Sequence, residues 1–267
     1  MNLLFPRGKE SFEIKKISVD GILSVFEYQK KGEIYMAMLE LAKDCIVNIN
    51  GSNPTLEQLR KLPLVNIEFA IVEAFKLYGL PSLLEGIYTC PRMNCGTKII
   101  KEVDESGFDN RIDISNKEVN FSEDMNPYIL SFSNDFKIVK NELEIDIKEI
   151  HFRDITIQDL IEISSQKESS IKNLIKSVMQ KTIVNIVFDS NSPEINFHKL
   201  MNRYLIEVLD FPNYQYIENA MLLFRTYGMD LKENFTCPKC NKKWKQTIDF
   251  TSFFVYALSL MSEGKGN

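Results

Sequence analysis

Apolar residues recur at helical spacing along much of the chain. Between residues 64 and 78 they fall every three or four positions, which predicts a helix that buries one face. Alternating polar and apolar residues from Phe12 to Val19, interrupted at Lys15 and Lys16, predict a kinked strand ahead of the first helix. The other predicted helices cover residues 22–26, 34–41, 160–163, 171–178 and 251–261.

The two halves of the chain share short segments that occur in the same order. The ten residues from Cys95 (CGTKIIKEVD) align without a gap on the ten from Cys240 (CNKKWKQTID). Further matches are EIKKISV at 13–19 with DIKEIHF at 146–152, IVNI at 46–49 and 183–186, Tyr-Gly at 78–79 and 227–228, and Thr-Cys-Pro at 89–91 and 236–238. The shared order predicts an internal duplication, with a first repeat at 1–104 and a second at 144–267.

A more polar segment, residues 105–143, separates the two repeats. Strand-like pieces at 111–114, 128–132 and 136–139 alternate with turn residues such as those at 133–135. The segment is too apolar for a disordered linker, so it predicts a β-rich connection between the repeats.

Four of the five cysteines occur as two closely spaced pairs. Cys237 and Cys240, in the sequence CPKC, have the spacing of a zinc knuckle. Cys90 and Cys95, in CPRMNC, form a similar knuckle that is two residues longer. Together the pairs offer the four thiolates of a closed tetrahedral site, which predicts one structural Zn²⁺ ion.

The residues around these pairs support a metal site. Gly96 and Asn241 directly follow the two knuckles, and both residue types tolerate the left-handed backbone conformation that a knuckle requires. The long separation between the pairs is expected if equivalent hairpins of two repeats meet. Two alternatives stay open: a site that has lost its metal and keeps buried cysteines, and a redox pair, which the following strand-like residues disfavour. Cys45 lies on an apolar stripe and is predicted to be an inert core cysteine.

These features predict an α+β fold of two pseudo-symmetric repeats. Each repeat contains a strand and helices and ends in a zinc-knuckle β-hairpin, and a small β insertion joins the repeats.

The charge and hydropathy of the chain exclude several classes of protein. The net charge is −5 over 267 residues with both signs mixed, so the basic footprint of a nucleic-acid-binding protein is missing at the level of the whole chain. One local basic patch covers residues 239–245. No apolar run reaches the roughly 20 residues of a membrane helix, and the first residues lack the apolar core of a secretory signal. We therefore expect a cytosolic protein with reduced thiols and no membrane partner.

Catalytic motifs are also missing from the sequence. It contains no phosphate-binding loop, dinucleotide fingerprint, metalloprotease motif or nucleophile elbow. His151 and His198 are the only histidines, and we expect both to be structural or exposed. The sequence thus predicts a protein that is not an enzyme and has no catalytic residues.

The segment from Thr236 to Phe254 (TCPKCNKKWKQTIDFTSFF) resembles the C-terminal end of small baseplate-hub and tail-assembly proteins of phages with contractile tails. The T-even-type baseplate hub assembly proteins are the group that it resembles most, over about twenty residues. The resemblance implies a structural or chaperone-like assembly protein whose partners are other baseplate or tail proteins. It also implies a location in the host cytoplasm during assembly, with the virion tail baseplate as a second location.

Aromatic residues of the predicted C-terminal helix are candidate contacts for such a partner. Phe253 and Tyr256 would form an exposed, partner-binding pair, while Phe250 and Phe254 would pack on the zinc hairpin. Burial of all four in the core stays open.

The alternative function is that of a zinc-ribbon protein that binds nucleic acid or acts in transcription. Lysines around Trp244 would contact phosphates while the indole ring stacks on a base. The acidity of the chain disfavours this function, as does Ile99 at the matching position of the first repeat.

Overall fold

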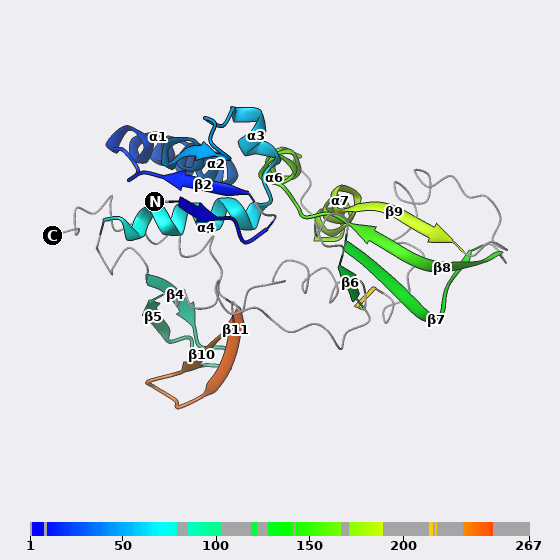
Figure 1. Cartoon of the computed structure of the whole chain (residues 1–267). Coiled ribbons are helices and arrows are strands. Elements are labelled where there is room, and N and C mark those ends of the chain that lie inside the picture. Colours follow the sequence, from blue (N-terminus) through cyan, green and yellow to red (C-terminus); the bar gives the residue numbers. More distant parts are fainter. Residues whose placement is uncertain are drawn as a thin grey trace. The chain divides into compact units, whose positions relative to one another are not determined.

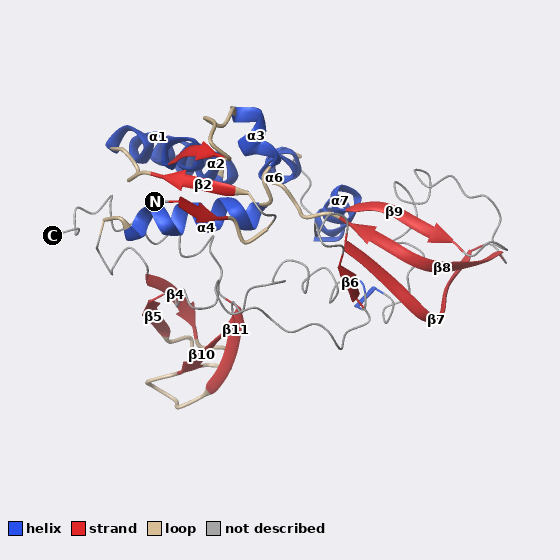
Figure 2. Ribbon diagram, in the orientation of Figure 1, coloured by secondary structure: helices blue, strands red, loops and turns tan. Residues whose placement is uncertain are grey.

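The structure is a computed structural model of the whole chain (Figure 1). It describes residues 2–7, 10–78, 85–102, 119–121, 128–140, 143–166, 171–188, 214–215, 217 and 232–247. The chain forms two compact units, Met1–Ile112 with Gly228–Asn267, and Asp113–Tyr227. Helices and small antiparallel sheets occur in both, so the predicted α+β class is confirmed (Figure 2). These units are sets of residues that pack together, and they are not the predicted repeats. The repeat boundaries at 104 and 143 therefore stay a prediction.

In the part of the first unit that the structure describes, a three-stranded antiparallel sheet lies with four helices. The strands, in sheet order, are β1 (Asn2–Leu4), β2 (Ser11–Ile14) and β3 (Ile46–Ile49). The helices are α1 (Val19–Lys30), α2 (Ile34–Cys45), α3 (Leu56–Lys61) and α4 (Leu64–Lys76). The three helices predicted at 22–26, 34–41 and 64–78 are therefore confirmed, with somewhat different ends.

Helices α2 and α4 supply most of the core of this unit. The buried residues of α2 recur at helical spacing, and they include Met38, Leu41 and Cys45. Nearly all of α4 is buried, as expected for a helix that is apolar on most sides. The ring of Phe12 in β2 lies 6.0 Å from that of Phe69 in α4, edge to face, which anchors the helix on the sheet.

A carboxylate from α2 holds the start of α1. The backbone N–H and the hydroxyl of Ser18 both donate to Asp44, the latter over 3.0 Å, and the same hydroxyl accepts from the N–H of Gly21 at 3.0 Å. The Lys15 ammonium lies 3.4 Å from Asp44 Oδ1. Gly21 fits closely, since a Cβ atom there would lie 2.6 Å from Asp44 Oδ2.

Two β-hairpins complete the described part of the first unit. They are β4 (Glu85–Thr89) with β5 (Lys98–Glu102), and β10 (Lys232–Thr236) with β11 (Lys243–Thr247). Each hairpin is a separate two-stranded antiparallel sheet. The cysteine pairs of the two predicted knuckles lie in the connections between β4 and β5 and between β10 and β11.

Among its described residues, the second unit has a four-stranded antiparallel sheet and two helices. The strands, in sheet order, are β6 (Val119–Phe121), β7 (Tyr128–Lys140), β8 (Leu143–Phe152) and β9 (Ile183–Phe188). Helices α6 (Ile157–Ser165) and α7 (Ile171–Thr182) connect β8 to β9. Residues 160–163 and 171–178 are helical, as predicted.

Two details of the topology predicted from the sequence are wrong, and both involve the strands of this unit. Residues 133–135 do not form a turn between two strands, because β7 continues through them with a register shift against β8 between Ser131 and Phe136. The segments 13–19 and 146–152 do not occupy matching elements either. The first crosses from β2 into α1, whereas the second lies wholly in β8, which stays paired with β7 and β9 as far as Phe152.

The start of α6 carries a capping box. The Thr156 hydroxyl accepts from the N–H of Asp159, and the Asp159 carboxylate accepts from the N–H of Thr156 at 2.9 Å. Arg153 donates to both oxygens of this carboxylate, at 2.7 and 2.9 Å. Burial alone would raise the pKa of Asp159, but the hydrogen bonds from Arg153 and Thr156 outweigh it and lower the pKa.

Several predicted features lie outside the described residues: the strand at 111–114, His198 and the C-terminal helix at 251–261. Among the helices that the structure does describe, none has the length and apolar character needed to cross a bilayer.

Candidate metal centre

The two cysteine pairs lie at the tips of two hairpins built on the same plan. Cys90 directly follows β4, and Cys237 directly follows β10. The N–H of Cys90 donates to the carbonyl of Thr97 at 2.9 Å, and that of Cys237 to the carbonyl of Lys242, also at 2.9 Å. These bonds close each hairpin at its first cysteine.

Left-handed residues allow the chain to turn at each tip. Gly96 has φ 54° and Asn241 has φ 56°, as the sequence predicts for the residue after each knuckle. Asn94 is a third left-handed residue, with φ 66°, and it lies in the longer first knuckle. The left-handed conformation of Asn94 was not predicted from the sequence, although asparagine just before the second cysteine was a usable signal.

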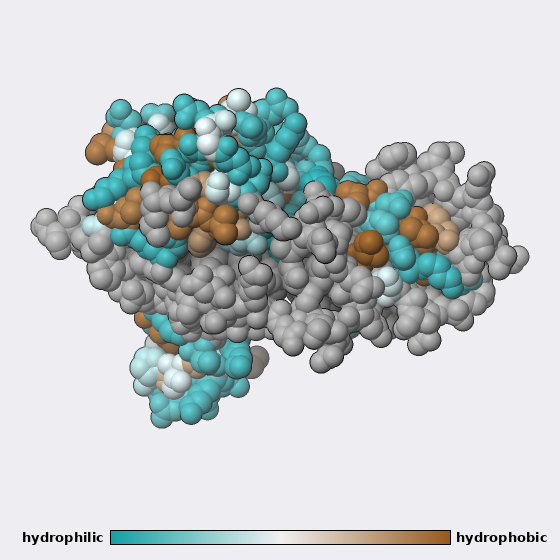
Figure 3. All heavy atoms as spheres, viewed as in Figure 1, coloured by the Kyte–Doolittle hydropathy of each residue, from teal (hydrophilic) through white to brown (hydrophobic). Residues whose placement is uncertain are grey.

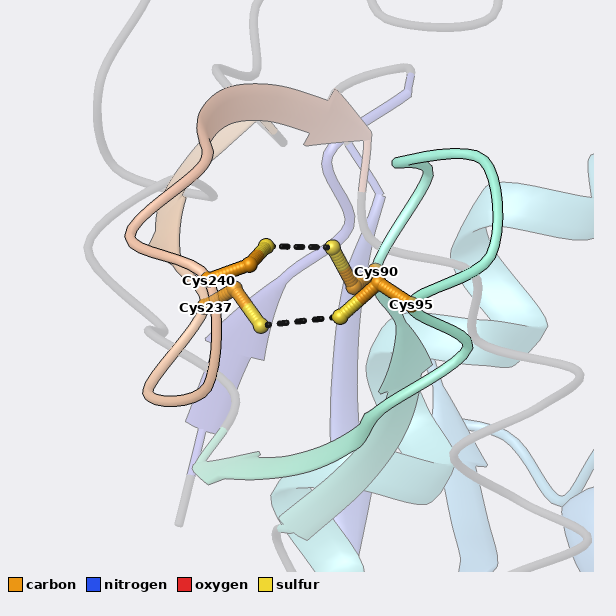
Figure 4. Close-up of side chains that lie close together, drawn as sticks. All are labelled: Cys90, Cys95, Cys237 and Cys240. Atoms are coloured by element: carbon orange, nitrogen blue, oxygen red, sulfur yellow. Dashed lines mark hydrogen bonds between the residues drawn. The ribbon is translucent and has the colours of Figure 1, made fainter.

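All four predicted ligands lie together, with each sulfur beside one from the opposite hairpin (Figure 4). The Sγ atoms of Cys90 and Cys240 are 3.7 Å apart, as are those of Cys95 and Cys237. All four sulfurs lie within 4.8 Å of one another. Zn–S bonds of about 2.3 Å in a tetrahedron place sulfurs about 3.8 Å apart, so the cluster has the size of a Cys₄ metal site.

A disulfide framework does not fit these distances, because bonded sulfurs lie about 2.05 Å apart. All five cysteines are free thiols in the structure. Cys45 is not part of the cluster: it is fully buried at the end of α2, and burial raises its pKa to about 12. The prediction of an inert core cysteine fits this environment.

Hydrogen-bond donors beside two of the sulfurs, those of Cys95 and Cys237, favour the charged thiolate form. The hydroxyl of Thr97, 3.2 Å from the Cys95 sulfur, and the Thr97 N–H lower the pKa of Cys95 to about 6. Burial acts to raise the pKa of Cys237, but N–H groups of its own knuckle outweigh it and lower the pKa. Burial raises the pKa of Cys90 to about 12 in the absence of a cation. A bound metal ion deprotonates its thiol ligands, so it would stabilise the charged form of all four.

Aromatic rings join the two hairpins beneath the cysteines. Tyr88 and Phe235 are buried with their ring centroids 4.6 Å apart, and Trp244 stacks on Phe235 at 5.2 Å. Strand pairing sets Ile99 opposite Tyr88 and Trp244 opposite Phe235, so Ile99 occupies the matching position in the first hairpin. Trp244 therefore fills space between hairpin residues.

A lysine from the first hairpin adds a polar link to the second. The Lys101 ammonium donates to the carbonyl of Asn234 at 3.2 Å and lies 5.0 Å from the centre of the Phe235 ring. At the tips, Arg92 donates to the carbonyl of Cys240 at 3.3 Å. The hairpins thus contact each other through protein groups as well as through the cysteine cluster.

The structure places the other candidate residues as follows. His151 lies in β8, with its Nε2 atom 2.8 Å from Glu149 Oε2. Phe250, Phe253, Phe254 and Tyr256 are outside the described residues. Within the part of the chain that is described, the cysteine cluster is the group of side chains suited to hold a metal ion.

Comparisons of the chain with protein-family models, with curated proteins and with solved structures find no match. The cysteine cluster and its surroundings are therefore the features of the chain that point to a function.

Proposed function

We propose that Cys90, Cys95, Cys237 and Cys240 bind one Zn²⁺ ion with a structural role. The observation that carries the proposal is the approach of four sulfurs from two distant hairpins to within 4.8 Å. All-cysteine tetrahedral sites take zinc or iron, and zinc is the usual metal of closed structural sites. Four protein ligands leave no coordination position for a substrate or an attacking water, so the ion would stabilise the fold.

The ion would close a very long loop. The chain leaves the first unit near Ile112 and returns near Gly228, so the whole second unit lies between the two ligand pairs in sequence. Closing a loop of a hundred residues or more costs about 5 kcal/mol of chain entropy. Structural zinc sites contribute about 10–16 kcal/mol of apparent binding free energy, which exceeds that cost.

We also propose that the chain is an internal duplication whose two terminal hairpins share this ion. Two backbone hydrogen bonds support it: Lys15 N–H to the carbonyl of Cys45, and Arg153 N–H to the carbonyl of Thr182. Each bond joins the residue after a strand, β2 or β8, to the last residue of the second helix that follows it, α2 or α7, just before an IVNI strand. Phe152, rather than Ile147, is then the counterpart of Ile14, which corrects the sequence alignment by five residues.

At the level of the cell, we propose a non-enzymatic structural or assembly protein of a phage contractile-tail baseplate hub. Its partners would be other baseplate or tail proteins, in the host cytoplasm during assembly. The support is the resemblance of the segment 236–254, which contains the second knuckle and the tryptophan-bearing strand β11.

Co-expression with the hub proteins of the same genome tests this role. We expect the zinc-loaded chain to co-elute with one of them in size-exclusion chromatography, and Cys240→Ser to weaken that complex. Genes for tail-tube, tape-measure and baseplate proteins should lie beside the gene. Failure of a zinc-loaded, folded chain to bind any hub protein would contradict the assembly role while leaving the metal site intact.

A further inference from the structure

The two zinc-binding segments, residues 90–101 and 234–247, differ sharply in charge from the rest of the chain. Together they contain seven Lys or Arg residues and no Asp or Glu. All 37 acidic residues of a chain with net charge −5 lie outside them. The complete hairpins, residues 85–102 and 232–247, contain eight Lys or Arg and three Glu, so the pair carries a net charge of +5 in an acidic protein.

The metal centre accounts for only part of this charge. Four thiolates around one Zn²⁺ leave about two negative charges, which nearby cations and N–H groups stabilise. Arg92 and Lys101 have structural tasks, since they donate to the carbonyls of Cys240 and Asn234. The remaining lysines exceed what the centre needs.

Four of these lysines form what we call the lysine face: Lys239, Lys242, Lys243 and Lys245. All four are exposed, and no ion pair joins any of them to a carboxylate of the described residues. Lys243 and Lys245 alternate along β11, so they point to the same side about 7 Å apart. Their cross-strand partners, Thr236 and Asn234, are uncharged. The hairpins present a mostly hydrophilic surface at the bottom of the view in Figure 3.

We propose that the lysine face binds an acidic segment of a partner protein. The proposal rests on the assembly role and adds a binding surface to it. It also requires the metal site, because the ion would hold β10 and β11 folded. Unpaired lysines on a rigid hairpin attract carboxylates and speed association with an acidic partner.

The composition of the module favours a protein over a nucleic acid as the occupant. Single-stranded nucleic acid is held by exposed aromatic rings in a basic groove, but here Trp244 stacks on Phe235 and Tyr88 is buried. Met93, 89% exposed in the first knuckle, lies next to Arg92, which reaches the second knuckle. An exposed methionine beside cations provides apolar contact typical of protein interfaces, which a phosphate backbone does not use.

Fluorescence anisotropy of the zinc-loaded full chain tests the proposal with two probes. One is an acidic peptide of about ten glutamates, and the other is a single-stranded oligonucleotide with about as many phosphates. The test variant is Lys243→Glu with Lys245→Glu. The matched control is Lys30→Glu with Lys61→Glu, which reverses two exposed lysines of the same unit outside the hairpins.

We expect the peptide to bind, with affinity that falls as salt rises, and the test variant to lose about tenfold or more while the control changes by less than about twofold. Zinc content should be equal in all three proteins. Absence of peptide binding, or an equal loss in the control, would overturn the proposal without touching the metal site. Oligonucleotide binding about tenfold tighter than peptide binding would also overturn it, in favour of nucleic acid.

Discussion

Gly21 should not tolerate even a methyl group, although it lies in a helix. Gly21 is in the first turn of α1, where alanine normally stabilises a helix by up to about 1 kcal/mol relative to glycine. Here the added Cβ would lie 2.6 Å from Asp44 Oδ2 and 2.9 Å from Asp44 Cγ. The carboxylate cannot simply swing away, because it accepts two hydrogen bonds from Ser18 and faces the Lys15 ammonium.

The size of the effect follows from those contacts. Hydrogen bonds to a charged group contribute about 1.5–3 kcal/mol each, and displacing Asp44 weakens two of them. The helix gain offsets part of the loss. We therefore expect Gly21→Ala to lower the free energy of unfolding of the first unit by about 2 kcal/mol.

Urea unfolding followed by tryptophan fluorescence measures this effect, because Trp244 is the only tryptophan and lies in the first unit. The control is a double-mutant cycle with Asp44→Ala, which removes the two closest atoms. In that background the cost of Gly21→Ala should fall by about 1 kcal/mol or more. A stability increase from Gly21→Ala alone would refute the reasoning.

Three further predictions concern single sites. Asp159→Asn should lower the free energy of unfolding by about 2–4 kcal/mol at neutral pH, because it weakens the bonds to Arg153. Those bonds lower the pKa of Asp159 from its ordinary 3.8. In urea unfolding, the stability difference between wild type and Asp159→Asn should therefore be complete above pH 3.8 and disappear as the pH falls below it. Cys45 should stay unreactive toward thiol reagents after chelation exposes the other four cysteines, and it should react only on unfolding; earlier labelling would contradict its burial. Changing Phe253 and Tyr256 to Ala should preserve zinc content and melting temperature but abolish co-elution with the hub partner. Unfolding of this variant, or normal binding by it, would exclude the predicted C-terminal helix as the docking surface.

Local sequence patterns predicted much of the fold because the spacing of apolar residues indicates which side chains become buried. The apolar stripe at 64–78 predicted α4, and the helical spacing at 34–41 and 171–178 predicted α2 and α7. The four cysteines were identifiable because knuckle spacing and the following Gly96 and Asn241 are determined by local geometry.

Features that depend on distant parts of the chain were not predictable in the same way. Residues 133–135 have the composition of a turn, but pairing with β8 keeps the chain extended around them. Ser18 caps α1 without a carboxylate three residues on, because Asp44 supplies one from the next helix. The spacing of residues near Ser18 does not indicate that a carboxylate from another helix takes part in this cap.

Metal analysis of freshly purified, reduced protein tests the zinc site most directly. We predict about one zinc and no iron per chain, lost in Cys240→Ser, and a marked fall in melting temperature after chelation, because the site contributes on the order of 10–16 kcal/mol. Cys45→Ser, which changes a cysteine outside the cluster, should retain the zinc. Folded wild-type protein that contains no zinc, or that melts at the same temperature with and without chelator, would contradict a structural Cys₄ zinc site.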